Sequence, residues 1–276
     1  MDERLKFDEY RFHFRPLVTP DLFNSVESVD DLMSNKTVIL REILQSQITF
    51  THRNRQLNYL YTDLGDDLHQ FRIANVRTTK IEQDFEEVVI ENEPSATLFL
   101  WNNPNEQKIL IESDKTSFQE SKVVGRLLER TLNERLKPHK LALSIKLEIE
   151  QSEFWQLVKK YEGKITEIEF NLLYPNLPKS HSVISEELEA VFKSINSPEG
   201  SVKFKSENGQ ALTNLVESNQ QINSLNTAAS LQGMPIVIKV KQEKGKKKTG
   251  KSRKSFTITL PTDTPALAEI IKSIME

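Results

Sequence analysis

The residues whose spacing is most suggestive of chemistry lie near the C-terminus, in the segment Gly245-Lys-Lys-Lys-Thr-Gly250-Lys251-Ser252. This segment matches G-x-x-x-x-G-K-[ST], a loop whose amides surround phosphates while its serine binds Mg²⁺. Such a loop needs a helix directly after it, because the helix N-terminus supplies amides and a positive dipole. Here the following residues, Arg253–Pro261, alternate with period two, which predicts a strand. We therefore expect no nucleotide site and no cofactor, and the sequence favours a protein without enzymatic activity over an enzyme.

The same region is strongly basic. Nine basic residues are opposed only by Glu243: Lys239, Lys241, Lys244, Lys246, Lys247, Lys248, Lys251, Arg253 and Lys254. The segment thus carries a net charge of +8, and because the whole chain carries −3, the remainder carries −11. Clustered lysines favour contact with the phosphate backbone of DNA or RNA, and the lack of an aromatic residue between Lys244 and Lys254 argues against base stacking.

Two other sets of residues suggest metal chemistry. Asp84, Glu106 and Lys108 follow the order Asp…Glu-x-Lys, which a metal-dependent nuclease would use to hold Mg²⁺ beside an attacking water. The second set offers ligands for a hard metal ion: Asp63, Asp66, Asp67 and His69. A polar turn with a capping aspartate explains the second set as well. Neither pattern is specific, so we assign no catalytic residue and no metal ligand.

The first part of the chain has the pattern of an antiparallel sheet. Phe7–Phe14 is expected to form a strand, and several short alternating segments follow between Thr37 and Ser113 with turn residues between them. Short strands at this spacing predict a meander. Residues 1–113 are therefore expected to form a β-rich N-terminal region.

Helices and strands alternate from residue 114 onward. Ser117 and Glu120 have the spacing of a capping box, ahead of a helix that is expected to end near Pro138. The strands that follow alternate between apolar and polar residues, so helices should cover one face of their sheet and leave the other polar. Residues 114–276 are thus expected to form an open α+β sandwich with a long basic hairpin over 236–260, built from strands Ile236–Val240 and Phe256–Leu260. The fold class predicted for the chain is α+β.

Composition narrows the class of protein. The chain has 276 residues, 37% of them apolar, and contains no cysteine, which excludes disulfides and thiolate metal sites and favours a reducing compartment. The N-terminal segment does not resemble a signal peptide, and no apolar stretch approaches the roughly 20 residues that span a bilayer. A cytoplasmic location without membrane contact is expected.

Several segments resemble a family of uncharacterised bacterial proteins associated with anti-phage defence gene clusters. The resemblance is carried by Leu68–Ala74, Thr97–Trp101, Lys108–Glu112, Leu147–Gln151, Ile165–Phe170 and Tyr174–Asn176. It implies a bacterial defence context and transfers no functional residues.

The sequence predicts a non-enzymatic protein that binds nucleic acid through the lysine-rich hairpin, as a component of a defence system with a possible protein partner. Two alternatives stay open: a metal-dependent nuclease or effector, and a protein–protein interaction subunit without nucleic-acid contact.

Overall fold

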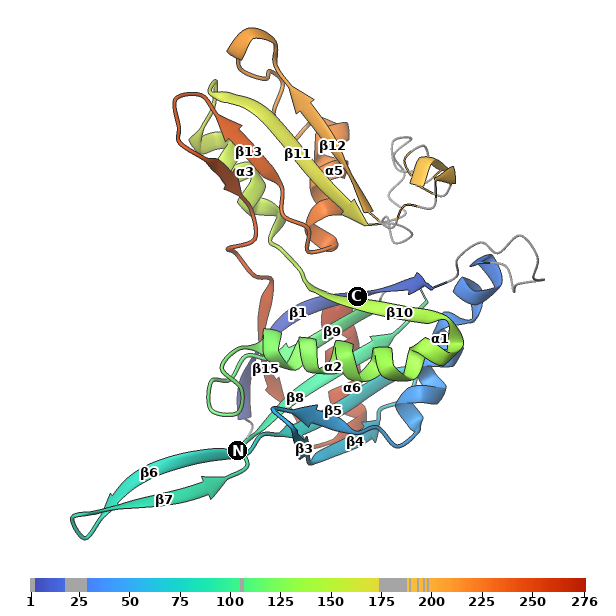
Figure 1. The fold of residues 1–276 in the computed structure, drawn as a ribbon, viewed down its shortest axis with the longest axis vertical. Helices are drawn as coiled ribbons and strands as arrows, with labels where there is room; N and C mark the ends of the chain where they lie inside the picture. The colour runs from blue at the N-terminus through green and yellow to red at the C-terminus, as the bar shows by residue number, and fades with distance from the viewer. Residues whose placement is uncertain are drawn as a thin grey trace. The chain divides into compact units, whose positions relative to one another are not determined.

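The computed structural model describes residues 3–17, 29–104, 107–173, 188, 190–192, 194–195, 197 and 199–276. The chain forms two compact units (Figure 1). Unit 1 comprises Met1–Ile145 and Ser255–Glu276, and unit 2 comprises Lys146–Lys254. The described residues form fifteen strands in several sheets, five α-helices and two short 3-10 helices, so the predicted α+β class is confirmed.

Unit 1 holds most of the strands. They are β1 (Glu3–Pro16), β2 (Phe50–His52), β3 (Arg55–Leu57), β4 (Tyr59–Asp63), β5 (Leu68–Ala74), β6 (Arg77–Gln83), β7 (Glu86–Asn92), β8 (Ser95–Asn102), β9 (Gln107–Glu112), β10 (Leu141–Leu147) and β15 (Ser255–Leu260). The helices are α1 (Val29–Gln45), α2 (Ser121–Leu136), the short 3-10 helix η1 (Lys137–His139) and α6 (Thr264–Met275).

The main sheet of unit 1 has seven strands. Six follow the order β10-β1-β9-β8-β5-β4, and β15 pairs with the first half of β1. The neighbours from β4 to β9 pair antiparallel, as the expected meander requires. Two separate hairpins, β2–β3 and β6–β7, complete the strands of this unit.

Helices cover both faces of this sheet (Figure 1). Gly125 of α2 packs against Tyr10 and Ile111 on one face. On the other face, α6 packs its apolar side chains over Phe7, Phe99 and Leu110. The central strands β8 and β9 are therefore buried on both sides. Every side chain of β9 and all those of β8 except the half-buried Ser95 are buried, so these two strands do not have the alternating burial expected between Thr37 and Ser113.

Unit 2 has one sheet with helices on one face. Its elements are α3 (Gln151–Lys160), β11 (Ile165–Leu173), β12 (Glu199–Lys205), η2 (Glu207–Gly209), α5 (Gln220–Leu231), β13 (Val237–Val240) and β14 (Lys246–Lys248). The strand order is β12-β11-β13-β14. Phe154 of α3 and Leu225 of α5 share a core with Ile168, Phe170 and Ile238 of the sheet. The opposite face of this sheet is polar, as the alternation predicted.

The two units divide the chain at different places from the expected boundary after residue 113. The helix and strand that follow this residue, α2 and most of β10, belong to unit 1 because α2 packs on its sheet and β10 pairs with β1. The C-terminal strand and helix also return to unit 1. No helix in the described parts of the chain is long and apolar enough to cross a membrane.

Candidate nucleic-acid interface

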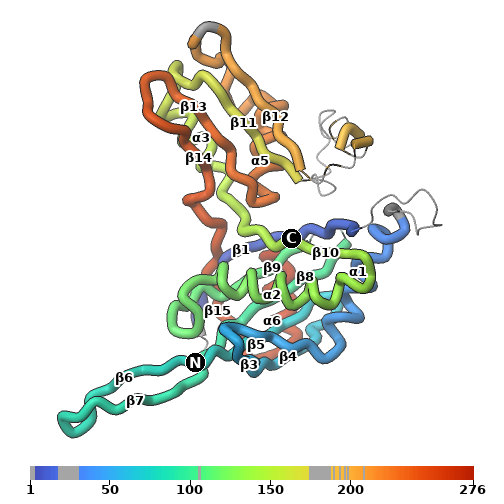
Figure 2. Tube along the Cα trace, in the orientation of Figure 1, coloured from blue at the N-terminus to red at the C-terminus, as the bar shows by residue number. Residues whose placement is uncertain are grey.

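The lysine-rich segment forms a shorter hairpin than expected. Strand β14, Lys246–Lys248, pairs antiparallel with β13 and forms the edge of the sheet of unit 2 (Figure 2). The turn between them contains Gln242 and Gly245, both with positive φ. The predicted partner, Phe256–Leu260, lies in β15 and pairs with β1 of unit 1 instead. The predicted hairpin over 236–260 is therefore wrong in its second strand.

The chain leaves this hairpin where residues 250–252 are hydrogen-bonded to Glu153 at the start of α3. Thr249 is still paired with Ile236, whose amide donates to the Thr249 Oγ1 at 2.9 Å. After it, the amides of Gly250, Lys251 and Ser252 donate to the Glu153 carboxylate over 2.9–3.2 Å. These bonds turn the chain away from β13, so β15 cannot extend the hairpin.

Glu153 thus occupies the position that a phosphate would take in a phosphate-binding loop. The amides of three successive residues surround its oxygens, as in the anion-binding nests that backbone turns form. Gly250 has a φ of +110°, which a side chain would disfavour. The residues after Ser252 lead into strand β15, as predicted, and no helix follows. The motif is satisfied by a carboxylate of the protein itself.

The outward face of the sheet gathers lysines from three strands. Ile168 and Phe170 of β11 point into the core, so Glu167 and Glu169 face outward. The register places the outward lysines on either side of these glutamates: Lys203 and Lys205 on β12, Lys239 on β13, and Lys246 and Lys248 on β14. We call these five lysines the lysine face. Three glutamates share the outward face with them, Glu167, Glu169 and Glu199, so five positive charges against three negative ones give a net charge of +2.

The register brings in two lysines that the sequence argument missed. Lys203 and Lys205 belong to β12, more than thirty residues before the lysine-rich segment. Their alternation with Val202 and Phe204 was the available signal, because it places both lysines on one face of a strand. That this strand lies in the same sheet as β14 became visible only in the structure.

Ion pairs hold part of the lysine face in place. The Lys203 Nζ lies 3.0 Å from Glu167, and the Lys246 Nζ lies 3.7 Å from Glu167 and 3.8 Å from Glu169. The hydrogen bond from Lys203 lowers the pKa of Glu167, and the charges of Lys246 and Lys239 lower it further. Glu167 therefore stays ionised, and the lysines around it remain in one region.

The other predicted basic residues lie elsewhere in unit 2. Lys241 and Lys244 are exposed at the turn, and Lys251 and Arg253 are exposed beyond β14. Lys247 points to the core side, 3.0 Å from Glu243 and 5.8 Å from the centre of the Tyr161 ring. Lys254 lies 3.5 Å from the buried Glu148. Lys247 and Lys254 thus stabilise the fold and are poorly placed to contact a ligand.

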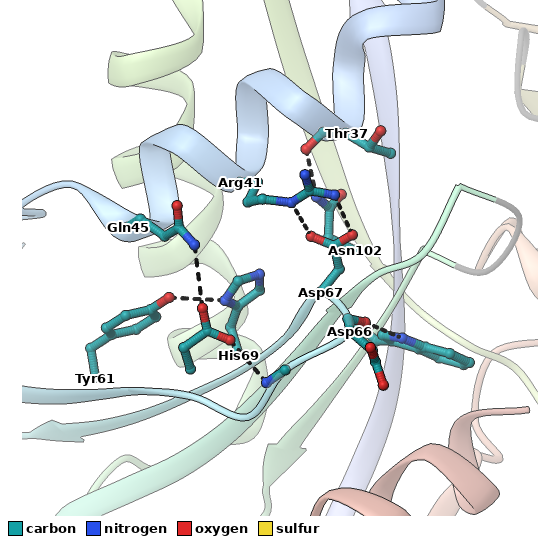
Figure 3. Close-up of polar contacts among 11 residues, drawn as sticks. Thr37, Arg41, Gln45, Tyr61, Asp66, Asp67, His69 and Asn102 are labelled. Atoms are coloured by element: carbon teal, nitrogen blue, oxygen red, sulfur yellow. Dashed lines mark hydrogen bonds and ion pairs between the residues drawn. The ribbon is translucent and has the colours of Figure 1, made fainter.

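The Asp63–His69 cluster is a structural network (Figure 3). Arg41 of α1 binds both oxygens of Asp67, with distances of 2.5 and 2.6 Å. Asp63 accepts from the amide of Gly65 at 2.9 Å, which is the capping role considered from the sequence.

A second part of this network joins Tyr61 to His69, whose Nδ1 lies 3.0 Å from the tyrosine hydroxyl. Burial raises the pKa of Tyr61 to about 12, and the charge of Asp63 contributes. Nowhere in the described residues do three acidic or histidine side chains converge as metal ligands.

The two described residues of the nuclease pattern, Asp84 and Lys108, lie in different environments. Asp84 lies in the exposed turn of hairpin β6–β7 with a φ of +53°. Lys108 is buried in the sheet of unit 1, 3.7 Å from the buried Glu9. Glu106 lies outside the described residues. A buried lysine and a residue at an exposed hairpin tip cannot hold the same water or metal ion.

Residues 59–276, most of the chain, match the family described as Domain of unknown function (DUF4747). The chain belongs to this family. No curated protein matches the chain. The family description states no activity, so functional inference rests on the site.

Proposed function

We propose that the protein is a non-enzymatic nucleic-acid-binding protein, and that the lysine face with the neighbouring β13–β14 turn contacts the phosphate backbone. The observation that carries the proposal is the register that gathers lysines of β12, β13 and β14 on one sheet face. Neighbouring strands lie about 5 Å apart, so the five lysines spread over an area in which several phosphates fit. The exposed Lys241 and Lys244 extend this area at the turn.

The proposed binding is insensitive to base sequence. The outward positions of these strands hold lysine, glutamate, serine, asparagine and aliphatic side chains, and the aromatic Phe170 and Phe204 belong to the core side. Ammonium groups recognise phosphates by charge, while sequence recognition requires contacts to base edges. We therefore expect DNA and RNA of different sequence to bind with similar affinity.

Fluorescence anisotropy with labelled single- and double-stranded DNA and RNA tests the proposal. Replacing Lys203, Lys239, Lys246 and Lys248 by glutamine should abolish most binding and reduce the slope of log K against log salt by about 0.9 for each lost duplex phosphate contact. The double replacement of Glu167 and Glu169 by glutamine should strengthen binding, because it removes two negative charges from the same face.

Lys159 and Lys160 provide the matched control. Both are exposed on α3, which packs on the opposite side of the sheet. The double variant Lys159→Gln, Lys160→Gln should bind nucleic acid like the wild type. Equal losses from this control and from the lysine-face variant would contradict the proposed site, because they would show a dependence on net charge alone.

The proposal includes a cytoplasmic location and a bacterial anti-phage defence context. The defence context is based on the segments, such as Thr97–Trp101, that resemble a bacterial family associated with defence gene clusters. Infection of bacteria that express the lysine-face variant or the wild type, with the neighbouring genes present, tests this part. If both proteins protect the bacteria equally, any defence role does not depend on nucleic-acid binding by the lysine face.

A protein-binding role is the second candidate, and hairpin β6–β7 favours it. Ile81, Val88 and Ile90 share one face of this hairpin and are exposed, and Phe85 at its tip is 97% exposed. Exposed apolar side chains gathered on one surface mark interaction sites. A partner that co-purifies with the wild type but not with a Phe85→Ser, Ile90→Ser variant would support this role, and retention by the variant would contradict it.

A further inference from the structure

Unit 1 contains a cavity of about 350 Å³ lined by basic side chains. It lies between hairpin β2–β3, the connection from β5 to β6 and the segment that leads into α2. The polar and aromatic residues that line it are His52, Arg53, Arg55, Asn75, Arg77, Phe118 and Gln119. Among the residues that the structure describes, the lining includes three arginines and no acidic residue. A cavity with this charge is a candidate site for an anion.

The segment before α2 shapes one wall. The Ser117 carbonyl accepts hydrogen bonds from the Asn75 Nδ2 at 2.6 Å and from the Arg77 Nε at 2.9 Å. Ser117 was expected to cap the helix, but α2 begins at Ser121 and its N-cap, Glu120, makes no side-chain capping bond. The expected capping box is wrong, because the segment around Ser117 is buried and used to fix Asn75 and Arg77.

The β2–β3 hairpin shapes the other wall. Arg53 and Asn54 both have positive φ, 49° and 63°, as the central residues of a type I′ turn do. His52 and Arg55 are paired across this turn, so the tight hairpin holds Arg53 and Arg55 beside the imidazole. Arg130 of α2 donates to the carbonyl of Thr51 and anchors the hairpin to the helix. The backbone of the hairpin thus places Arg53 and Arg55 at the same wall of the cavity.

The pKa of His52 is affected by the positive charge of the cavity. Burial lowers the pKa of this imidazole, and the charges of Arg53, Arg130 and Arg77 lower it further. His52 lies edge-on to the buried Phe118 ring, with 6.1 Å between ring centres. The start of α2 adds the positive end of a helix dipole, partly offset by the carboxylate of Glu120. Neutral His52 can still donate one hydrogen bond to an anion.

We infer that this cavity binds a phosphate group, either as inorganic phosphate or as the terminal group of a small organic phosphate such as a nucleoside monophosphate. Arginine forks match the oxygens of a phosphate and form charge-assisted bonds to it. The volume lies at the small end of the range for small-molecule sites, so it accepts a phosphate with a limited organic part. The site lies in unit 1 and does not depend on the lysine face of unit 2.

Isothermal titration calorimetry at low chloride tests the inference with inorganic phosphate, AMP and adenosine as probes. Inorganic phosphate and AMP should bind with one site per chain, and adenosine should not bind. AMP binding more tightly than phosphate would show that the site takes an organic phosphate, and equal affinities would show recognition of the phosphate alone. If neither inorganic phosphate nor AMP binds, the inference is wrong.

Variants distinguish this cavity from other basic surfaces. Arg55 is exposed and makes no side-chain hydrogen bond or ion pair with any described residue, so Arg55→Gln should fold normally and weaken phosphate binding about tenfold. Arg77→Gln should weaken it at least as much, and circular dichroism will show whether this variant keeps its fold. The control Arg4→Gln removes an exposed charge from β1 of the same unit.

The outcomes separate this site from the proposed nucleic-acid interface. Unchanged affinity in Arg55→Gln, or an equal loss in Arg4→Gln, would overturn the assignment to the cavity. The lysine-face variant should bind phosphate like the wild type. A chain that binds AMP but no nucleic acid would leave this inference standing and contradict the proposed function.

Discussion

The carboxylate of Glu153 accepts hydrogen bonds from the amides of Gly250, Lys251 and Ser252. These three residues are part of the segment that matches a nucleotide-binding loop. The sequence around them does not indicate that Glu153 is their hydrogen-bond partner. The residue lies about one hundred positions earlier, at the start of α3. A phosphate at this place would have to displace a buried, ionisable side chain that already satisfies the loop.

Glu153→Gln should therefore destabilise unit 2. Glutamine keeps the size of the side chain but loses the charge and one acceptor, so we expect the free energy of unfolding to fall by about 1–3 kcal/mol. Trp155 lies in unit 2 and Trp101 in unit 1, so a Trp101→Phe background lets tryptophan fluorescence during urea unfolding report unit 2 alone.

The exposed Glu162, near the end of α3, is the control for this experiment. Glu162→Gln should change the free energy by less than about 0.5 kcal/mol. If Glu153→Gln had an equally small effect, the three amides would have other partners and the proposed role of Glu153 would be wrong.

His69 gives unit 1 a dependence on pH. Burial lowers the pKa of His69 in the folded state, although the charges of Asp63 and Asp67 act against this. In the unfolded chain a histidine has a pKa of about 6.5. As the pH falls below this value, the unfolded state binds a proton before the folded state does. The stabilisation is therefore complete above this pH and is lost as the pH falls towards the folded pKa.

Urea unfolding of unit 1 at pH 7.5 and 5.5, followed by Trp101 in a Trp155→Phe background, measures this effect. The wild type should lose more stability at pH 5.5 than His69→Gln does. The exposed His139 supplies the control His139→Gln, which should keep the wild-type dependence. The same pH dependence in His69→Gln and the wild type would rule out His69 as its source.

At the level of elements, strands β13, β14 and β15 show that alternation can identify a strand but cannot identify the strand with which it pairs. Both β13 and β15 alternate, and each was recognised as a strand. Alternation states which face of a strand is buried but does not name its partner. The strand β14 is three lysines, so it has no apolar signal, and it forms by backbone pairing with the edge of β13. The nearest alternating segment was therefore taken as the partner of β13, which was wrong.

Hairpin β6–β7 is an element with little role in the core. Apart from the half-buried Arg77, all its side chains are exposed, and its strands pair only with each other in the described sheets. Figure 1 shows it projecting from the rest of unit 1. An isolated two-stranded hairpin buries too little apolar surface to stabilise a domain.

Replacing Thr79–Ile90 by Asn-Gly should leave unit 1 folded. Thr78 and Glu91 are paired across the hairpin, so a two-residue type I′ turn can join them. The urea midpoint of unit 1 should stay within the error of the wild-type value. A lost cooperative transition would show that the hairpin contributes to the core.

At the level of the whole molecule, unit 2 is inserted within unit 1. Unit 1 uses both ends of the chain, because β15 pairs with β1 and α6 covers one face of its sheet. Unit 2 is continuous in sequence and has a core of its own. The two units should therefore respond differently to truncation.

A chain that ends at Lys254 lacks β15 and α6 and exposes Phe7, Phe99 and Leu110. We expect it to lose the cooperative unfolding of unit 1, as followed by Trp101. A fragment of residues 146–254 should fold alone and give dispersed amide signals in NMR spectra. A truncated chain with an intact unit 1 transition, or an unfolded fragment, would contradict this division.

The sequence by itself determined the α+β class, the N-terminal meander, most of the strands, and the strand that follows the apparent phosphate-binding motif. These features depend on local periodicity and on residues such as Pro138 that end elements, so they are visible in short segments.

Only the tertiary structure decided which strands share a sheet, where the units divide, and which charges meet. It joined Lys203 to Lys246 across β11, attached Glu153 to residues 250–252, and formed a cavity lined by Arg53, Arg55 and Arg77. The physical reason is that these contacts join residues far apart in sequence, and their formation depends on which apolar faces pack together. A period in the sequence shows that a face must be buried, but not what will cover it.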